Sequence, residues 1–202
     1  MANAYATPDD LALYLDGVSE STYTAIWTAL LESASRFIDT ETMQFFYQIP
    51  SATYHFSGQG NSMIIPGVPI VSISNITVAF YTGGNTYVVP SGQYFLYPET
   101  PLPGHPYLWL ELTNVPQSGL AAEFFYGKQN VAITMVAGWP SVPADIKHLT
   151  CKLAARAWKS RQTGYSGIQG NSETGLVYAK ELDSMDHAIL QRYQRLTLGG
   201  LL

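Results

Sequence analysis

The chain has 202 residues, of which 47% are hydrophobic and 12% are charged, and its formal net charge is −5. This length suits one large domain or a core with an insertion, and the apolar share is enough to bury a sizeable core. The single cysteine, Cys151, excludes an internal disulfide, and without a secretion signal or an apolar membrane span we expect a soluble protein, made in a cytoplasm, with no membrane contact.

Residues 1–50 are predicted to form two helices. Thr7 is placed to cap the first helix, Pro8 suits its first position, and this helix should end near Leu15. The second helix should run from about Ser19 to about Phe45. Apolar residues recur along it at spacings of three and four and form one stripe, namely Ile26, Leu30, Ala34, Phe37 and Ile38.

Residues 51–139 are predicted to form β strands. The segments 71–81 and 130–138 alternate in polarity and are rich in β-branched residues. Four shorter segments are further strand candidates: 86–89, 94–97, 107–112 and 121–126. Turns rich in glycine and proline separate these segments. Such close spacing predicts antiparallel strands in a small sandwich or barrel.

Residues 140–202 are predicted to return to helix, beginning at Pro143. The apolar face of this helix is expected to contain Ile146, Leu149, Leu153, Ala157 and Trp158. Three cations, Lys152, Arg156 and Lys159, fall together on another face. A loop rich in glycine and serine is expected at 162–175, followed by a last helix from about Ala179 to about Leu196 and an apolar tail.

The order of these segments predicts an α+β fold. The N- and C-terminal helices would form one helical core, and the antiparallel β segment, sandwich-like or barrel-like, would be an insertion in it. We expect the boundaries to lie at residues 1–50, 51–139 and 140–202. The first helical segment is too small to form a core by itself, which favours the insertion over two successive domains.

The β segment carries unusually little charge. Within residues 51–139 the charged side chains are Glu99, Glu111, Glu123 and Lys128. Because interface cores are depleted in charge and enriched in tyrosine, this composition favours a surface that packs against neighbouring subunits. The alternative is a surface of Ser, Thr, Asn and Gln that stays soluble without charge.

Tests for catalytic or metal sites give no positive result. Asp145, His148 and Cys151 lie three residues apart on one predicted helix, but successive steps of three drift around the helix, so only neighbouring pairs share a face. The other histidines, His55, His105 and His187, stand alone, and Glu181 and Asp183 fall on opposite sides of a helix. We therefore expect a protein that is not an enzyme and that needs no metal or other cofactor.

Two binding hypotheses remain open. The face with Lys152, Arg156 and Lys159 is either an ordinary solvated helix face or, in a ring of many copies, a contact for phosphates. A second hypothesis is a carbohydrate platform, for which the candidate aromatic residues are Tyr81, Tyr87, Tyr94, Tyr97 and Trp109. Against it, the β segment has few of the charged side chains that usually orient sugar hydroxyls.

Several short segments, taken in order, resemble the head–tail connector family of tailed bacteriophages, whose members are also called adaptor or head-completion proteins. They are YATPDDL (5–11), SASRFID (33–39), AGW (137–139), PADIK (143–147), LAARAW (153–158) and LQRYQR (190–195). None of them is a chemical signature, so the resemblance rests on their order along most of the chain. The β insertion looks longer than that of a minimal adaptor.

The resemblance implies a structural protein in the neck of a virion. Members form a ring, commonly of twelve copies, beneath the portal, where it extends the channel for double-stranded DNA and presents a platform to a stopper or tail protein. The residues implied to dock on the portal are Arg192, Tyr193, Arg195, Leu196, Leu198, Leu201 and Leu202. Lys152, Arg156 and Lys159 would face the channel or a neighbouring subunit. The alternatives are a stopper or tail-completion protein, or a carbohydrate-binding β module of the tail.

Overall fold

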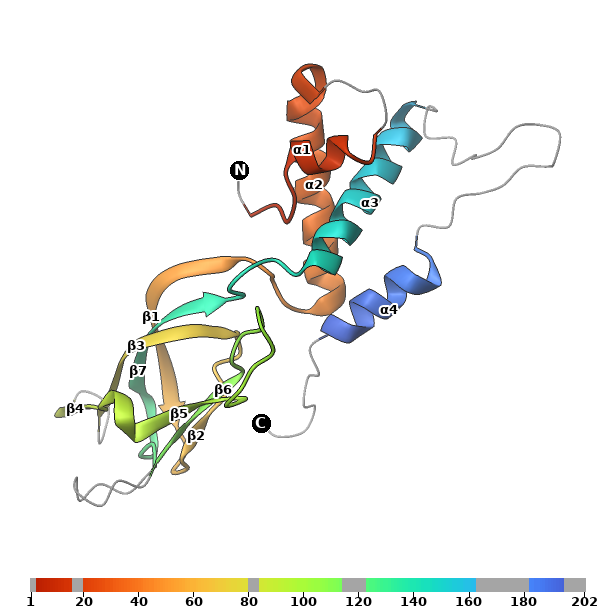
Figure 1. Cartoon of the computed structure of the whole chain (residues 1–202). Helices are drawn as coiled ribbons and strands as arrows, with labels where there is room; N and C mark the ends of the chain where they lie inside the picture. Colours follow the sequence, from red (N-terminus) through yellow and green to blue (C-terminus); the bar gives the residue numbers. More distant parts are fainter. Residues whose placement is uncertain (1–2, 16–19, 80–83, 114–122, 163–181, 195–202) are drawn as a thin grey trace. The chain divides into compact units, whose positions relative to one another are not determined.

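The computed structural model describes residues 3–15, 20–79, 84–113, 123–162 and 182–194 (Figure 1). The chain divides into two compact units. Met1–Phe46 and Val142–Leu202 form a helical unit, and Tyr47–Ser141 form a β unit inserted between them. The expected α+β fold with an antiparallel β insertion is confirmed. Among the helices of the described segments, none combines the length and the apolar character needed to span a bilayer.

The helical unit contains α1 (Pro8–Ala12), α2 (Glu20–Thr42), α3 (Ala144–Gln162) and α4 (Ser184–Tyr193). Thr7 caps α1 in a reciprocal capping box with Asp10, as expected of a threonine before proline, but this helix ends before Leu15. Helices α1, α2 and α3 lie against one another (Figure 1). They share an apolar core whose larger side chains include Leu11, Trp27, Leu31 and Trp158.

The buried stripes of two helices differ from the predicted ones. On α2 the buried residues are Trp27, Leu31, Ala34, Ser35, Ile38 and Thr42, whereas Phe37 is exposed. On α3, Ala154 and Ala155 are fully or almost fully buried, whereas Leu153 is half-buried and Ala157 is exposed. Small residues allow neighbouring backbones to approach closely, and α3 packs against both α1 and α2. Its buried stripe is therefore wider than the pattern of large apolar residues suggested.

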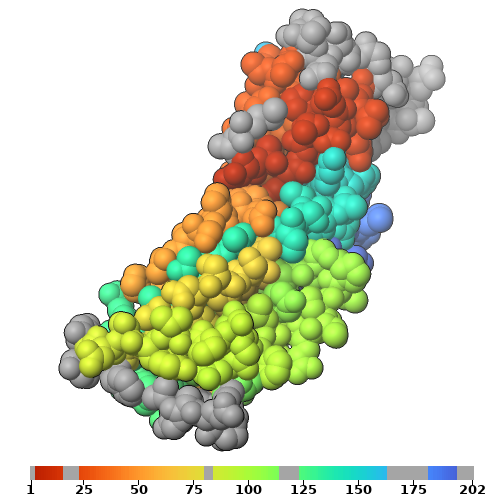
Figure 2. Space-filling model, turned by 60° about the vertical axis from the view of Figure 1, so that its left-hand side comes forward, coloured from red at the N-terminus to blue at the C-terminus, as the bar shows by residue number. Residues whose placement is uncertain are grey.

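The β unit consists of two antiparallel sheets. Their strands, in spatial order, are β1 (Gln48–Gly58), β7 (Gly127–Gly138), β3 (Ile70–Ala79) and β4 (Thr86–Val88) in the first, and β2 (Met63–Ile64), β6 (Trp109–Leu112) and β5 (Tyr94–Tyr97) in the second. A short 3-10 helix, η1 (Ser91–Gln93), precedes β5. In Figure 2 the residues of β3 (yellow) and of the segment 84–113 (yellow-green to green) lie side by side on the surface of this unit.

One apolar core lies between the two sheets. Ile133 and Met135 of β7, Ile76 of β3 and Leu110 of β6 are fully buried in it. Along β7 the buried side chains alternate with half-buried ones from Val131 to Ala137, which is the period of two that the sequence predicted for 130–138. This alternation gives the first sheet an inner face in the core and an outer face that is less buried.

The strand predictions for the β unit missed one strand and included one segment that is not a strand. Strand β1 was not predicted as a separate strand; it contains a proline, Pro50, and is largely exposed. Pro50 is tolerated because β1 is the edge strand of its sheet, and the residue falls in an irregularity of the register between Ile49 and Ala52. The predicted strand at 121–126 is wrong for its described residues, of which Phe124 forms a single bridge with Asn61.

Candidate docking site on helices α3 and α4

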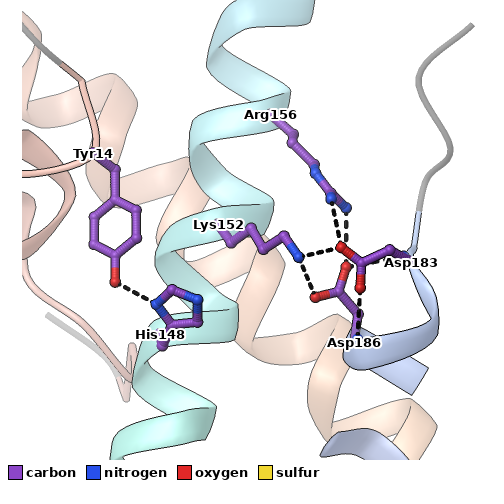
Figure 3. A network of polar contacts seen from close by, with 6 residues as sticks. All are labelled: Tyr14, His148, Lys152, Arg156, Asp183 and Asp186. Atoms are coloured by element: carbon purple, nitrogen blue, oxygen red, sulfur yellow. Dashed lines mark hydrogen bonds and ion pairs between the residues drawn. The ribbon is translucent and has the colours of Figure 1, made fainter. Parts of the chain in front are cut away.

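Helix α3 presents two cations to the beginning of α4. Lys152 and Arg156 are four residues apart, so they lie on the same side of the helix one turn from each other. Figure 3 shows both side chains reaching toward Asp183 and Asp186, which lie at the start of α4. The two cations and the two carboxylates are called the α3–α4 ion-pair cluster below.

The first turn of α4 is built by a reciprocal capping box. Asp183 is the N-cap, its Oδ1 accepts from the backbone N–H of Asp186 at 2.9 Å, and Oδ2 of Asp186 accepts from the backbone N–H of Asp183 at 3.1 Å. Such a cap satisfies N–H groups that the first turn of a helix leaves without partners. The cap also fixes where both carboxylates point. The pattern D-x-x-D at 183–186 was a readable signal for this helix start, which was predicted near Ala179 instead.

Each cation contacts both carboxylates. Nζ of Lys152 lies 2.5 Å from Oδ2 of Asp183 and 2.7 Å from Oδ1 of Asp186. For Arg156, Nη1 lies 3.1 Å from Oδ2 of Asp186, and Nη2 lies 3.5 Å from Oδ2 of Asp183. The Asp186 side chain is only 2% exposed, whereas that of Asp183 is 42% exposed. Asp186 is therefore the desolvated centre of the cluster. Removing its charge would leave Lys152 and Arg156 with only the more exposed carboxylate of Asp183 as an ionic partner in the cluster.

The cluster shifts the pKa values of Asp183 and Lys152 in the direction that favours their charged forms. The hydrogen bond from Lys152, with that from the Asp186 backbone N–H, lowers the pKa of Asp183 to about 2. Burial disfavours the charge of Lys152, but the hydrogen bonds to both aspartates outweigh burial and raise the pKa of this ammonium. The ion pairs are thus fully formed across the neutral pH range.

The other end of α4 is anchored by Tyr193. Its hydroxyl donates to Oδ1 of Asp145 at 2.8 Å, and its ring meets Phe46 edge-on with the ring centroids 5.4 Å apart. Nε2 of Gln44 donates to the Tyr193 backbone carbonyl. Burial and the contact with Asp145 raise the pKa of the Tyr193 hydroxyl to about 12, so it remains a donor at neutral pH. Contacts at both ends therefore fix α4 on the helical unit.

The residues predicted to dock on the portal fall into two groups. Tyr193 is buried, and Arg192 is exposed with its Nη1 3.3 Å from Oδ2 of Asp145. The remaining residues lie outside the described segments: Arg195, Leu196, Leu198, Leu201 and Leu202. Helix α4 therefore ends where these residues begin, and its anchoring defines the point from which they continue.

The predicted basic face is divided by the fold. Lys152 and Arg156 are matched by carboxylates of the same chain, whereas Lys159 lies exposed in the last turn of α3, outside the ion-pair cluster. The pairing was not predicted from the sequence because 27 to 34 residues separate the partners. Helical periodicity places residues on one face of their own helix and does not identify the element that covers this face.

The candidate catalytic residues make separate contacts. Asp145 binds Tyr193 and Arg192, whereas Nδ1 of His148 lies 2.7 Å from the hydroxyl of Tyr14 (Figure 3). Cys151 is buried in the helical core, and burial raises the pKa of its thiol to about 11. A thiol in this environment is not a nucleophile at neutral pH. Among the described residues there is no group of three or more histidines, cysteines and acids that could hold a metal ion.

The proposed carbohydrate platform does not form as a unit. Tyr97 and Trp109 stack with ring centroids 5.5 Å apart on the outer face of β5 and β6. Tyr87 and Tyr94 instead pack against the core between the sheets, and Tyr81 lies outside the described residues. The described aromatic residues thus provide one stacked pair rather than an extended platform.

No protein-family model and no curated protein matches the chain. Similar solved structures include a chain from the neck of an empty GTA particle computed with C6 symmetry. The two sequences are 14% identical, and the TM-score is 0.57. The likeness covers 99% of this chain and 94% of the matched chain. A chain from the neck of a native GTA particle computed with C12 symmetry is 14% identical over 90% of this chain and 88% of its own, with a TM-score of 0.46. A chain from the virion of a native gene transfer agent (GTA) particle is 17% identical, with a TM-score of 0.47. This likeness covers 92% of this chain and 82% of the matched chain. The first likeness shows a shared fold over nearly the full length of both chains.

Proposed function

We propose that this chain is a structural protein of a virion neck, a head–tail adaptor that binds beneath the portal. The observation that carries the proposal is the full-length likeness to a neck component, with a TM-score of 0.57 over 99% of this chain. Because the likeness includes nearly all residues of both chains, it concerns this chain as a whole and not a common module within it. The order of the connector-like segments in the sequence supports the same assignment.

We propose further that the protein acts as a ring of identical copies. The similar neck was computed with six-fold symmetry, and the twelve copies that the connector resemblance implies are a multiple of six. A ring gives each subunit two lateral neighbours, which fits a β unit with so few charged side chains. The ring would extend the channel for passing double-stranded DNA, which it would contact without sequence specificity.

In this proposal the end of the chain docks on the portal. The α3–α4 ion-pair cluster and Tyr193 fix α4, so the residues after Gln194 start from a defined position. Arg195 and the leucines of the tail would supply charge and apolar surface to the portal. Lys152 and Arg156 would act as positioning residues for this segment, whereas Lys159 would face a neighbouring subunit or the channel. The β unit would meet the neighbours and the next neck or tail protein.

Assembly of the purified protein tests the proposal. We expect the full chain to form a ring in solution, or when mixed with its portal, and to migrate with the portal as one complex in size-exclusion chromatography with mass detection. A chain that lacks residues 195–202 should keep its ability to form rings and lose the portal complex. A full chain that stays monomeric at high concentration with and without portal would contradict the proposal, and binding to a glycan array would favour the carbohydrate-binding module.

A further inference from the structure

The first sheet of the β unit has an uncharged, hydroxyl-rich outer face. Cross-strand pairing aligns outward side chains in rows, two of which are Thr53–Thr134–Asn75 and His55–Ala132–Thr77–Val88. The rows between them, such as Tyr54–Ile133–Ile76, point into the core. The hydroxyls of Thr53 and Thr134 are 2.9 Å apart and hydrogen-bonded to each other. We call these seven outward residues the threonine face.

The second sheet has an outer face of a different kind. Met63, Glu111 and Phe95 pair across β2, β6 and β5 in one row, and Trp109 and Tyr97 pair in the next. Leu110 and Ile64, which alternate with them, are buried in the core. Phe95 is 54% exposed and Met63 is 40% exposed. These five residues are called the aromatic face, and Glu111 in its central strand is their one charged side chain.

The two faces are chemically complementary. The threonine face offers uncharged hydroxyl and amide donors from its threonines and from Asn75, and it is built mostly of small side chains that a flat aromatic surface can cover. The aromatic face offers an acceptor, the Glu111 carboxylate, among apolar side chains. Because the two sheets lie on opposite sides of one core, the faces point in opposite directions within the β unit.

Self-pairing of the aromatic face is disfavoured by the same carboxylate. A two-fold contact would bring two Glu111 side chains toward each other in a desolvated interface, where like charges repel strongly. A contact between the aromatic face of one copy and the threonine face of the next avoids this repulsion and places Glu111 against neutral donors. Such a contact joins two different surfaces, and contacts of this type generate a closed ring when the rotation from one copy to the next closes.

We propose that the lateral contact of the ring joins the aromatic face of one copy to the threonine face of its neighbour. This inference rests on the proposed ring assembly and names the surfaces that would make it. A second copy of the chain is the occupant of both faces. The β unit then has few charged side chains because both faces lose their contact with water when the ring forms.

The test blocks each face separately in the full chain. Thr134→Glu places a carboxylate at the centre of the threonine face, opposite the neighbour's Glu111, and Phe95→Glu does the same to the aromatic face. We expect each variant alone to be monomeric by mass photometry, with association weakened about 100-fold or more, because an unpaired charge would be buried. An equimolar mixture of the two variants should form dimers and nothing larger. The intact aromatic face of Thr134→Glu binds the intact threonine face of Phe95→Glu, and the two faces left over in the dimer are both blocked.

Controls separate this inference from the function on which it rests. Ser91→Glu adds the same charge at an exposed position of η1 and should form rings like the unchanged chain. His55→Glu replaces Thr134→Glu as the block if circular dichroism shows that the latter is misfolded. Rings formed by both blocked variants, or dimers formed by Thr134→Glu alone, would overturn the proposed faces and leave the neck function standing. An unchanged chain that never associates, with or without portal, would overturn both.

Discussion

Asp186 is the more buried of the two carboxylates in the α3–α4 ion-pair cluster. Its carboxylate is 2% exposed and contacts both Lys152 and Arg156, whose side chains are 25% and 29% exposed. For Asp186→Asn we expect the free energy of unfolding to fall by about 2 kcal/mol, less than for a fully buried pair because water still reaches the cations. The shift of the urea midpoint measures this loss, with unchanged slope.

Asp9→Asn is the matched control for this change. Asp9 is exposed in the first turn of α1, so the same loss of one negative charge should leave the midpoint nearly unchanged. If both substitutions shifted the urea midpoint equally, the contacts of the ion-pair cluster would contribute no stability beyond that of one negative charge anywhere on the surface. The sequence shows both aspartates equally well, and only the contacts distinguish them.

At the scale of elements, the docking of α4 should depend on acid pH. The pKa of Asp183 is about 2 in the folded chain, below its usual value of 3.8, so its contribution to stability is present above about pH 4 and is lost as the pH falls toward 2. We expect the unchanged chain to lose stability over this range more steeply than Asp183→Asn, which has no carboxylate to protonate there. Urea unfolding at several pH values between 2 and 6 measures the difference, and parallel curves would contradict it.

The elements differ in how far the sequence determines them. The start of α1 was predicted correctly because Thr7, Pro8 and Asp10 act within one turn, and β7 because its alternation is regular over its whole length. The edge strand β1 was missed because Pro50 interrupts it and its first half is largely exposed, so its period of two is confined to the residues from Thr53 onward. Edge strands are stabilised by the neighbour with which they pair, and that pairing is not a local property.

At the scale of the molecule, the β unit should fold by itself. Its ends lie together, since Gln48 pairs with Gly138 and the Trp139 N–H donates to the Tyr47 carbonyl at 3.3 Å, and its core lies entirely within residues 47–141. We expect a fragment of residues 47–141 to give a β-type circular dichroism spectrum and to unfold cooperatively. In the matched deletion variant, a short glycine–serine linker joins residues 46 and 142, and the helices should be kept.

An unfolded 47–141 fragment would contradict this prediction and indicate that the β unit depends on the helical unit for stability. A folded fragment would also allow the two outer faces to be tested apart from the helices. The chain would then resemble other insertions whose neighbouring ends allow one unit to interrupt another without disturbing its core.

The sequence by itself determined the α+β order, the capping of α1, the alternation of β7 and the scarcity of charge in the β unit. Each of these depends on neighbours along the chain or on composition. Tertiary structure alone decided that Lys152 and Arg156 face Asp183 and Asp186, and that the side chains of one sheet form a threonine face while those of the other form an aromatic face. The reason is physical: helical and strand periods fix which residues share a face, but the partner of that face is chosen by packing between segments far apart in the chain.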